Sequence, residues 1–398
     1  MALTINRLLG GAMAVALLLG SGGAIVSAGR RNLAASAVIR CVANSWTVER
    51  TVASQPSALS MGRLWRGSLT SLTNDSAGGR RLRGVTYLLT GQELDGAVAG
   101  LQAAVALSPA DRLGHYWLGV AWYRQGNELG AREQWRQARA ANALFYIGET
   151  LKERGQRVAA QKWYVRAAEI AADEDTRHVR GLASYALAQL YLEEGRRADG
   201  LHWLETAVMA WPQNVQARYR LAREYSASER HAEAIAQMQA VLTEEPFSAT
   251  WRGAMAEALL RAGENELAAV YFHQALQIGN PHNAQDRYWL SRAWYGLSMV
   301  AYQRQAWEES LTAAAQAVTL RGAIDRSWYP YFEKLAQEAL AANPEEMECY
   351  LLIGAIYEAG QEYAGARDYY HQAEQRWPQA AEVRAAIERV STAEPPGH

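Results

Sequence analysis

An all-α fold, in which antiparallel helical hairpins stack into an α-solenoid, is predicted by three features of this sequence. A pattern recurs in which an apolar residue is followed by Gly or Ala, then by a bulky residue three positions on and a small residue nine positions later. Its copies are Leu118-Gly119 with Trp122 and Ala131, Leu187-Ala188 with Tyr191 and Gly200, Leu221-Ala222 with Tyr225 and Ala234, and Ile353-Gly354 with Tyr357 and Ala366. The copies are separated by multiples of about 34 residues, a period typical of stacked helical hairpins. Helix-breaking prolines close successive units, at Pro109, Pro212, Pro246 and Pro378.

Each unit is expected to hold two helices joined by a short turn that carries glycine or polar residues. Units begin at residue 78 and near 112, 141, 181, 215 and 249. The expected turns are Gly91 to Asp95, Gln125 to Asn127, Arg154 to Gln156, Glu194 to Arg196, Ser228 to Arg230 and Ala262 to Glu264. After an insertion we expect a unit at 291–322, an extra helix at about 326–342 without a clear first partner, and a unit at 347–378.

The chain of 398 residues is divided by these patterns into four segments. Residues 1–29 are predicted to target a membrane, because Arg7 precedes an uncharged apolar run over residues 8–29 that is long enough to span a bilayer. This run is either a signal peptide cleaved after Ala28 or a transmembrane anchor, and we expect an anchor with the repeats on the extracytoplasmic side. Residues 30–77 form a linker or an ordered cap, 78–378 the repeat array, and 379–398 a capping helix and tail.

Composition excludes several classes of function. The formal charge is −1, and acidic and basic residues alternate along the helices, so no nucleic-acid partner is expected. Cys41 and Cys349 are too far apart in the sequence for a zinc site, and the histidines are dispersed. The sequence contains no glycine-rich phosphate loop, nucleophile elbow or zinc-binding helix motif. We therefore expect no enzymatic activity, no cofactor and no metal.

The recurring pattern resembles the tetratricopeptide repeat family over about 300 of the 398 residues. The resemblance implies a right-handed superhelix in which small residues at the eighth and twentieth places allow the two helices of a hairpin to approach closely. It also implies that the first helix of each hairpin lines a concave groove. The groove residues carried over are Tyr116, Tyr123, Phe145, Glu149, Lys152, Tyr185, Gln189, Tyr219, Arg223, Arg292, Tyr295 and Tyr302.

Tyrosine and arginine are frequent in this set, and both are enriched at the centres of protein interfaces. The sequence therefore predicts a non-catalytic scaffold that is tethered to a membrane and docks a peptide or helix of a partner protein, assembling an envelope complex. The lysine and asparagine pattern that binds C-terminal carboxylates in chaperone adaptors is absent. The alternative for single rings is burial against neighbouring hairpins.

Two other functions remain open. A dense aromatic run, comprising Tyr288, Trp289, Trp294, Tyr295, Tyr302, Trp307, Trp328, Tyr329 and Tyr331, is a candidate surface for stacking on sugar rings. The protein would then bind glycan or assist a polysaccharide-assembly enzyme. Alternatively, the solenoid self-associates as a structural subunit.

Overall fold

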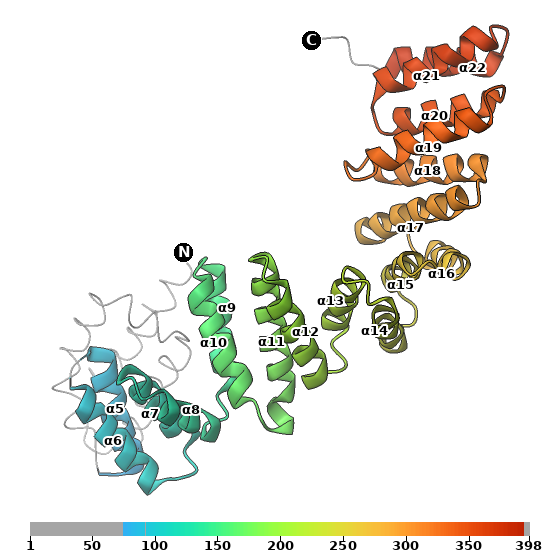
Figure 1. The fold of residues 1–398 in the computed structure, drawn as a ribbon. Coiled ribbons are helices and arrows are strands. Elements are labelled where there is room, and N and C mark those ends of the chain that lie inside the picture. The colour runs from blue at the N-terminus through green and yellow to red at the C-terminus, as the bar shows by residue number, and fades with distance from the viewer. Residues whose placement is uncertain (1–74, 92, 394–398) are drawn as a thin grey trace. The chain divides into compact units, whose positions relative to one another are not determined.

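The computed structural model describes residues 75–91 and 93–393, and all regular secondary structure in these ranges is helical (Figure 1). The prediction of an all-α solenoid of stacked hairpins is confirmed. The predicted membrane segment at 1–29 lies outside the described residues, as does the linker up to residue 74. In the ranges that are described, no helix is long and apolar enough to cross a membrane.

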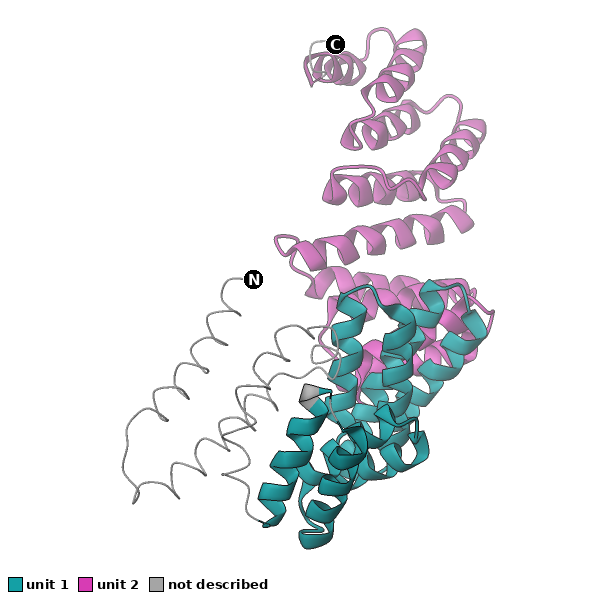
Figure 2. Cartoon of the chain, turned by 90° about the vertical axis from the view of Figure 1, so that its left-hand side faces the viewer, with its two compact units in different colours: residues 1–212 teal, residues 213–398 magenta. Residues whose placement is uncertain are grey.

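The chain divides into two compact units, Met1–Pro212 and Gln213–His398, which are described separately (Figure 2). The continuity of the array from one unit into the next stays a prediction.

In the described part of the first unit, residues 75–91 and 93–212, four hairpins follow one another, and each expected turn joins the two helices of one hairpin. The hairpins are α5 (Ala77–Thr90) with α6 (Leu94–Leu107), α7 (Arg112–Arg124) with α8 (Glu128–Gln137), α9 (Ala141–Glu153) with α10 (Arg157–Ile170), and α11 (Arg177–Glu193) with α12 (Arg197–Ala210). A short 3-10 helix, η1 (Glu174–Thr176), precedes α11.

The second unit holds four hairpins and two further helices. The hairpins are α13 (Val215–Ser226) with α14 (His231–Glu244), α15 (Ala249–Arg261) with α16 (Asn265–Ile278), α17 (Ala284–Gln303) with α18 (Trp307–Arg321), and α20 (Met347–Ala359) with α21 (Tyr363–Arg376). The extra helix is α19 (Tyr329–Ala342), which contacts both α18 and α20. The last helix, α22 (Ala381–Ala393), packs on α20 and α21.

Helix α17 corrects the expected boundary at residue 291, because it begins at Ala284. The Asn283 side chain accepts hydrogen bonds from the backbone N–H groups of Gln285 and Asp286, which makes it an effective N-cap. About two additional turns of helix therefore precede the predicted start, and they carry Tyr288 and Trp289.

The eighth-place glycines explain how closely the hairpin helices approach. A Cβ atom added to Gly119 would lie 2.6 Å from two atoms of the Trp135 indole, and one added to Gly148 would lie 2.6 Å from the Tyr164 ring. In both pairs the ring comes from the second helix of the same hairpin, 16 positions later. The role predicted for the small residues is thus confirmed, because only glycine leaves room for these rings.

The hairpin turns share one backbone conformation. Gly126, Gly155, Gly195 and Gly263 all have positive φ angles, between 75° and 82°. Where glycine is missing from the turn, Glu229 adopts the same left-handed region at φ 60°. A side chain in this region is strained by contact between its Cβ and the backbone, so the turn geometry is imposed by the packing of the two helices.

Candidate partner-binding face

The predicted groove residues lie on the first helices of the hairpins, and within each unit we call the side formed by these helices the first-helix face. In the first unit they are Tyr116 and Tyr123 on α7, Phe145, Glu149 and Lys152 on α9, and Tyr185 and Gln189 on α11. In the second unit they are Tyr219 and Arg223 on α13 and Arg292, Tyr295 and Tyr302 on α17.

Several groove candidates of the first unit take part in hairpin packing. The Tyr123 ring lies 5.8 Å from the Trp135 ring and 5.2 Å from the Trp163 ring, between centroids, and the Arg166 guanidinium is 4.8 Å from its centre. Because Trp135, Trp163 and Arg166 all come from second helices, the Tyr123 ring is engaged by the interior of the stack. For Tyr123 the structure thus shows the alternative given for single groove rings, which is burial against neighbouring hairpins.

Phe145 and Glu149 also contact a second helix. The Phe145 ring packs 5.7 Å from that of Tyr164 on α10, and the Tyr164 hydroxyl donates a hydrogen bond to the Glu149 carboxylate. Burial, followed by this contact with Glu149, raises the pKa of the Tyr164 phenol. Glu149 therefore has an intrachain partner that joins the two helices of its hairpin.

The remaining candidates of this unit are half-buried. Lys152 on α9 lies 3.5 Å from the side-chain oxygen of Gln189 on α11, so these two residues join successive first helices. Burial raises the pKa of Tyr116 to about 12, which keeps its hydroxyl neutral. Tyr185 lies on α11, one turn before Gln189, and is half-buried.

In the second unit, the Tyr219 ring is surrounded by two tryptophan rings and by the groove candidate Arg223. This ring lies 5.2 Å from that of Trp251 and 6.2 Å from that of Trp289, and the Arg223 guanidinium is 5.9 Å from its centre. Burial is the main cause of the raised pKa of Tyr219, and the charges of Arg223 and Glu257 act on it in opposite directions. Side chains from three successive first helices, α13, α15 and α17, thus meet at one tyrosine.

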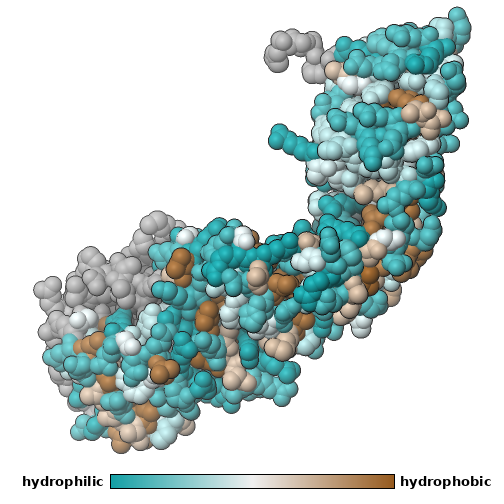
Figure 3. All heavy atoms as spheres, in the orientation of Figure 1, coloured by the Kyte–Doolittle hydropathy of each residue, from teal (hydrophilic) through white to brown (hydrophobic). Residues whose placement is uncertain are grey.

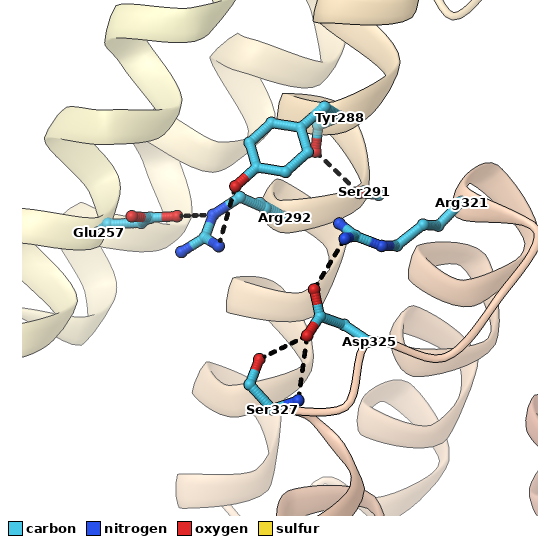
Figure 4. Close-up of polar contacts among 7 residues, drawn as sticks. All are labelled: Glu257, Tyr288, Ser291, Arg292, Arg321, Asp325 and Ser327. Carbon is cyan, nitrogen blue, oxygen red and sulfur yellow. Dashed lines mark hydrogen bonds and ion pairs between the residues drawn. The ribbon is translucent and has the colours of Figure 1, made fainter. Parts of the chain in front are cut away.

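Arg292 is fixed by two intrachain partners, as Figure 4 shows. Its Nε atom donates a hydrogen bond to Glu257, and its Nη1 atom lies 3.4 Å from the Tyr288 hydroxyl. Burial would lower the pKa of this guanidinium, but the charge of Glu257 and its hydrogen bond outweigh burial and raise it. Arg292 therefore stays charged in a half-buried position.

A second arginine contacts the same tyrosine from the end of α18. The Arg321 guanidinium lies 5.5 Å from the centre of the Tyr288 ring, and it forms a 2.8 Å ion pair with Asp325 (Figure 4). Asp325 accepts hydrogen bonds from the Ser327 backbone N–H at 3.0 Å and from its hydroxyl at 2.8 Å, and these bonds lower the pKa of the carboxyl group. Two arginines are thereby held beside a tyrosine that is 43% exposed.

Tyr288 is an exposed residue that the sequence placed in the aromatic run and not among the groove residues. It lies in the turns at the start of α17 that precede the expected boundary at residue 291. The turn after α17 repeats the earlier hairpin geometry, since the Ala306 N–H bonds the Ala301 carbonyl as the Glu264 N–H bonds that of Leu259. In this register Tyr295 is the counterpart of Gly253, so the repeat spacing does not point to Tyr288.

Tyr295 and Tyr302 pack against the extra helix α19 and its N-cap residue Trp328. The Tyr295 ring stacks on Trp328 with a centroid distance of 4.4 Å and an interplanar angle of 6°, and the Tyr302 hydroxyl donates to Glu338 at 2.6 Å. Trp328 itself is only 2% exposed. Stacking on a sugar requires a free ring face, and these rings cover one another, so the geometry gives the glycan alternative no support here.

Other features of the described residues can be compared with this face. In the view of Figure 3 most of the surface is hydrophilic and the hydrophobic patches are small. Cys349 is buried and burial raises the pKa of its thiol, which makes it an unreactive core residue. Among the described residues, no cluster of His, Cys, Asp and Glu has the arrangement needed to hold a metal ion.

Comparison with known proteins gives three kinds of result. No curated protein sequence matches this chain. Solved structures similar to it include a human IFIT1 dimer with PPP-AAAA (16% identity, TM-score 0.46, 89% of this chain and 91% of that chain) and MamA (14% identity, TM-score 0.32, 55% and 97%). Another is a tetratricopeptide repeat protein from Parabacteroides merdae (15% identity, TM-score 0.35, 80% and 100%).

Models of the tetratricopeptide repeat match three segments, at residues 82–143, 191–258 and 333–381. The predicted resemblance is confirmed for these segments, and they include helices of both units. These three segments are therefore similar to tetratricopeptide repeats, a type of repeat that is typical of protein-interaction scaffolds.

Proposed function

We propose that this protein is a non-catalytic scaffold that docks a peptide or helical segment of a partner protein on its first-helix face. The observation that carries the proposal is the convergence of α13, α15 and α17 on Tyr219. Tyrosine and arginine side chains there form a surface that is partly exposed and chemically suited to protein contacts.

The side chains of this surface are held in place before any partner arrives. Arg292 is fixed by Glu257 and Tyr288, and Arg321 is fixed by Asp325. Ordering a long side chain on binding costs about 0.5–1.5 kcal/mol, so contacts that already order it favour association. A scaffold function needs such a prepared surface and no reactive group.

We further propose that residues 8–29 tether the protein to a membrane, with the repeats on the extracytoplasmic side, where they assemble an envelope complex. The support is the uncharged run that follows Arg7. Membrane fractionation of the full chain and of a variant that lacks residues 8–29 tests this. Retention of the shortened variant in the membrane fraction, or release of the full chain by carbonate, would contradict the anchor.

The docking proposal is tested by affinity capture from gently solubilised source membranes. The bait is the full chain, compared with the double variant Tyr185→Ala/Tyr219→Ala, which removes one groove tyrosine from each unit. Phe247→Ala is the matched control, because Phe247 is an 84% exposed aromatic residue in the loop between α14 and α15.

We expect a partner that is captured by the full chain and by Phe247→Ala but lost from the double variant. Circular dichroism must show that the double variant keeps its helix content. Capture of the same partners by all three baits would place binding away from the first-helix face.

A further inference from the structure

Charge is segregated between the two helices of each of the first three hairpins in the second unit, whereas the hairpin of α20 and α21 does not follow this pattern. The first helices α13, α15 and α17 together carry seven arginines and three carboxylates, a formal charge of +4. The second helices α14, α16 and α18 carry five carboxylates and one arginine, a formal charge of −4. The first-helix side of these three hairpins is therefore their positive side, although the whole chain is close to neutral.

Not all of these arginines are available to a ligand. Arg218 on α13 donates a 2.8 Å hydrogen bond to Gln237, and Arg252 on α15 donates to Gln274. Both glutamines lie on second helices, so these two guanidinium groups join the helices of a hairpin. The arginines that lie beside the half-buried Tyr219 and the exposed Tyr288 are Arg223 and Arg292 from first helices and Arg321 from the end of the second helix α18.

These three guanidinium groups keep unused hydrogen-bond donors. A guanidinium has five N–H donors, and Arg292 uses those of Nε and Nη1. Arg321 uses Nη2 for Asp325. In the ranges that the structure describes, Arg223 is exposed and contacts only the Tyr219 ring, with no ion pair. The unused donors have the planar geometry that binds carboxylates in a bidentate manner.

Aromatic rings separate these donors. Tyr219 lies beside Arg223, and Tyr288 lies beside both Arg292 and Arg321, with guanidinium-to-ring distances of 5.5 to 5.9 Å. A ligand that matches this order carries carboxylates separated by side chains that pack on tyrosine. An extended peptide that alternates acidic with apolar or aromatic residues has this chemistry.

We propose that the face formed by Tyr219, Arg223, Tyr288, Arg292 and Arg321 binds an acidic segment of the partner protein. This inference rests on the proposed docking function and specifies the charge of the ligand. A nucleic acid fits less well, because its phosphates are continuous. Glu257 and Asp325 lie among the arginines and would repel such a backbone, whereas a peptide can place its carboxylates between them.

Selection from a display library of random twelve-residue peptides, with the full chain as target, tests the proposal. We expect selected peptides to be enriched in Asp and Glu relative to the library. Selected peptides that are neutral or basic would overturn the acidic ligand while leaving peptide docking intact. Failure to select any peptide above background would overturn both.

The binding site is then tested by fluorescence anisotropy with a labelled selected peptide. Arg223→Gln and Arg321→Gln are each expected to weaken binding about tenfold, as for loss of one charge-assisted contact. Arg384→Gln is the control, because Arg384 is an exposed arginine of the same unit on the distant helix α22. Equal affinity of all three variants would overturn the assignment of the face.

Two further measurements separate the ligand classes. Binding of the peptide should weaken as salt is raised, because exposed charges are screened, and replacing its acidic residues by Gln and Asn should abolish binding. A twelve-nucleotide single-stranded RNA serves as the competing probe. If this RNA binds more tightly than the peptide and loses affinity in Arg223→Gln, the acidic-peptide proposal is wrong.

Discussion

Substituting Gly119 by Ala is expected to destabilise the first unit, although alanine is the better helix former. The new Cβ would lie 2.6 Å from Cδ1 and Nε1 of Trp135 and 3.1 Å from the carbonyl oxygen of Ala131. Favourable carbon contacts lie near 3.5–4.0 Å, so the indole would have to move by about 1 Å. Trp135 is fully buried, at 0% exposure, and packs against Tyr123 and Trp163, so it has no space to move into.

The change in the free energy of unfolding caused by Gly119→Ala is the sum of two opposing effects. Overpacking of a well-packed core costs about 1–3 kcal/mol, while Gly to Ala in a helix interior gains about 1 kcal/mol. Gly100 in α6 is the matched control, since a Cβ there would have its nearest contact at an ordinary 3.5 Å. Gly100→Ala should therefore stabilise the protein by about 1 kcal/mol. Gly119→Ala should be less stable than Gly100→Ala by about 1–3 kcal/mol.

Urea unfolding followed by circular dichroism measures this difference, and hydrogen exchange in α7 and α8 localises it. In a Trp135→Leu background the penalty of Gly119→Ala should largely disappear, because the clashing ring is gone. If Gly119→Ala is as stable as Gly100→Ala, the close approach of the ring to the glycine does not limit packing in this hairpin. The reasoning about eighth-place glycines would then fail.

Three further outcomes are expected. Glu229→Gly should increase the free energy of unfolding in urea by about 1 kcal/mol, because it relieves a positive φ angle. Ala227→Gly, at a right-handed position of the same turn, should decrease it; equal effects would contradict this account. Burial would raise the pKa of the Glu358 carboxyl, but hydrogen bonds from Arg389 outweigh burial and lower this pKa. The ionised Glu358 therefore stabilises the folded state fully above its ordinary pKa of 4.5, and this stabilisation is lost as pH falls through the lower pKa of the folded state. Acid unfolding below that value should be less pronounced in Glu358→Gln, and identical pH profiles would argue against the pair. A variant with Cys349 as its single cysteine should react with iodoacetamide only after denaturation, since the thiol is buried and its pKa is raised; rapid labelling of the native protein would refute this.

Much of the fold follows from local sequence signals. The turns at Gly126, Gly155, Gly195 and Gly263 were located because glycine adopts positive φ without strain. The small residue before each buried ring recurs at the repeat spacing, so the pairing of Gly119 with Trp135 follows from the periodicity. The repeat pattern did not predict the start of α17, because the sequence there departs from the repeat. The local signal for this start is Asn283, which caps the helix.

The candidate site was harder to predict than the fold. Repeat positions placed Tyr219, Arg223 and Arg292 on first helices, the first two on α13 and the third on α17, but they also gave Tyr123 and Tyr295 as equivalents. Both rings are engaged by other parts of the chain, Tyr123 by second helices and Tyr295 by Trp328. Periodicity specifies the helix and the face on which a side chain lies, and it does not specify what covers that face.

The sequence by itself determined that the described chain is a stack of helical hairpins, because each hairpin is encoded by short-range patterns that repeat. Tertiary structure alone decided which aromatic side chains remain partly exposed. Helix α19 falls outside the repeat pattern, and its Tyr331 hydroxyl lies 2.8 Å from the buried Ser298 hydroxyl of α17. That contact joins residues 33 positions apart and belongs to no repeat. The physical reason is that local patterns set the backbone of each helix, whereas exposure depends on every segment that packs against it.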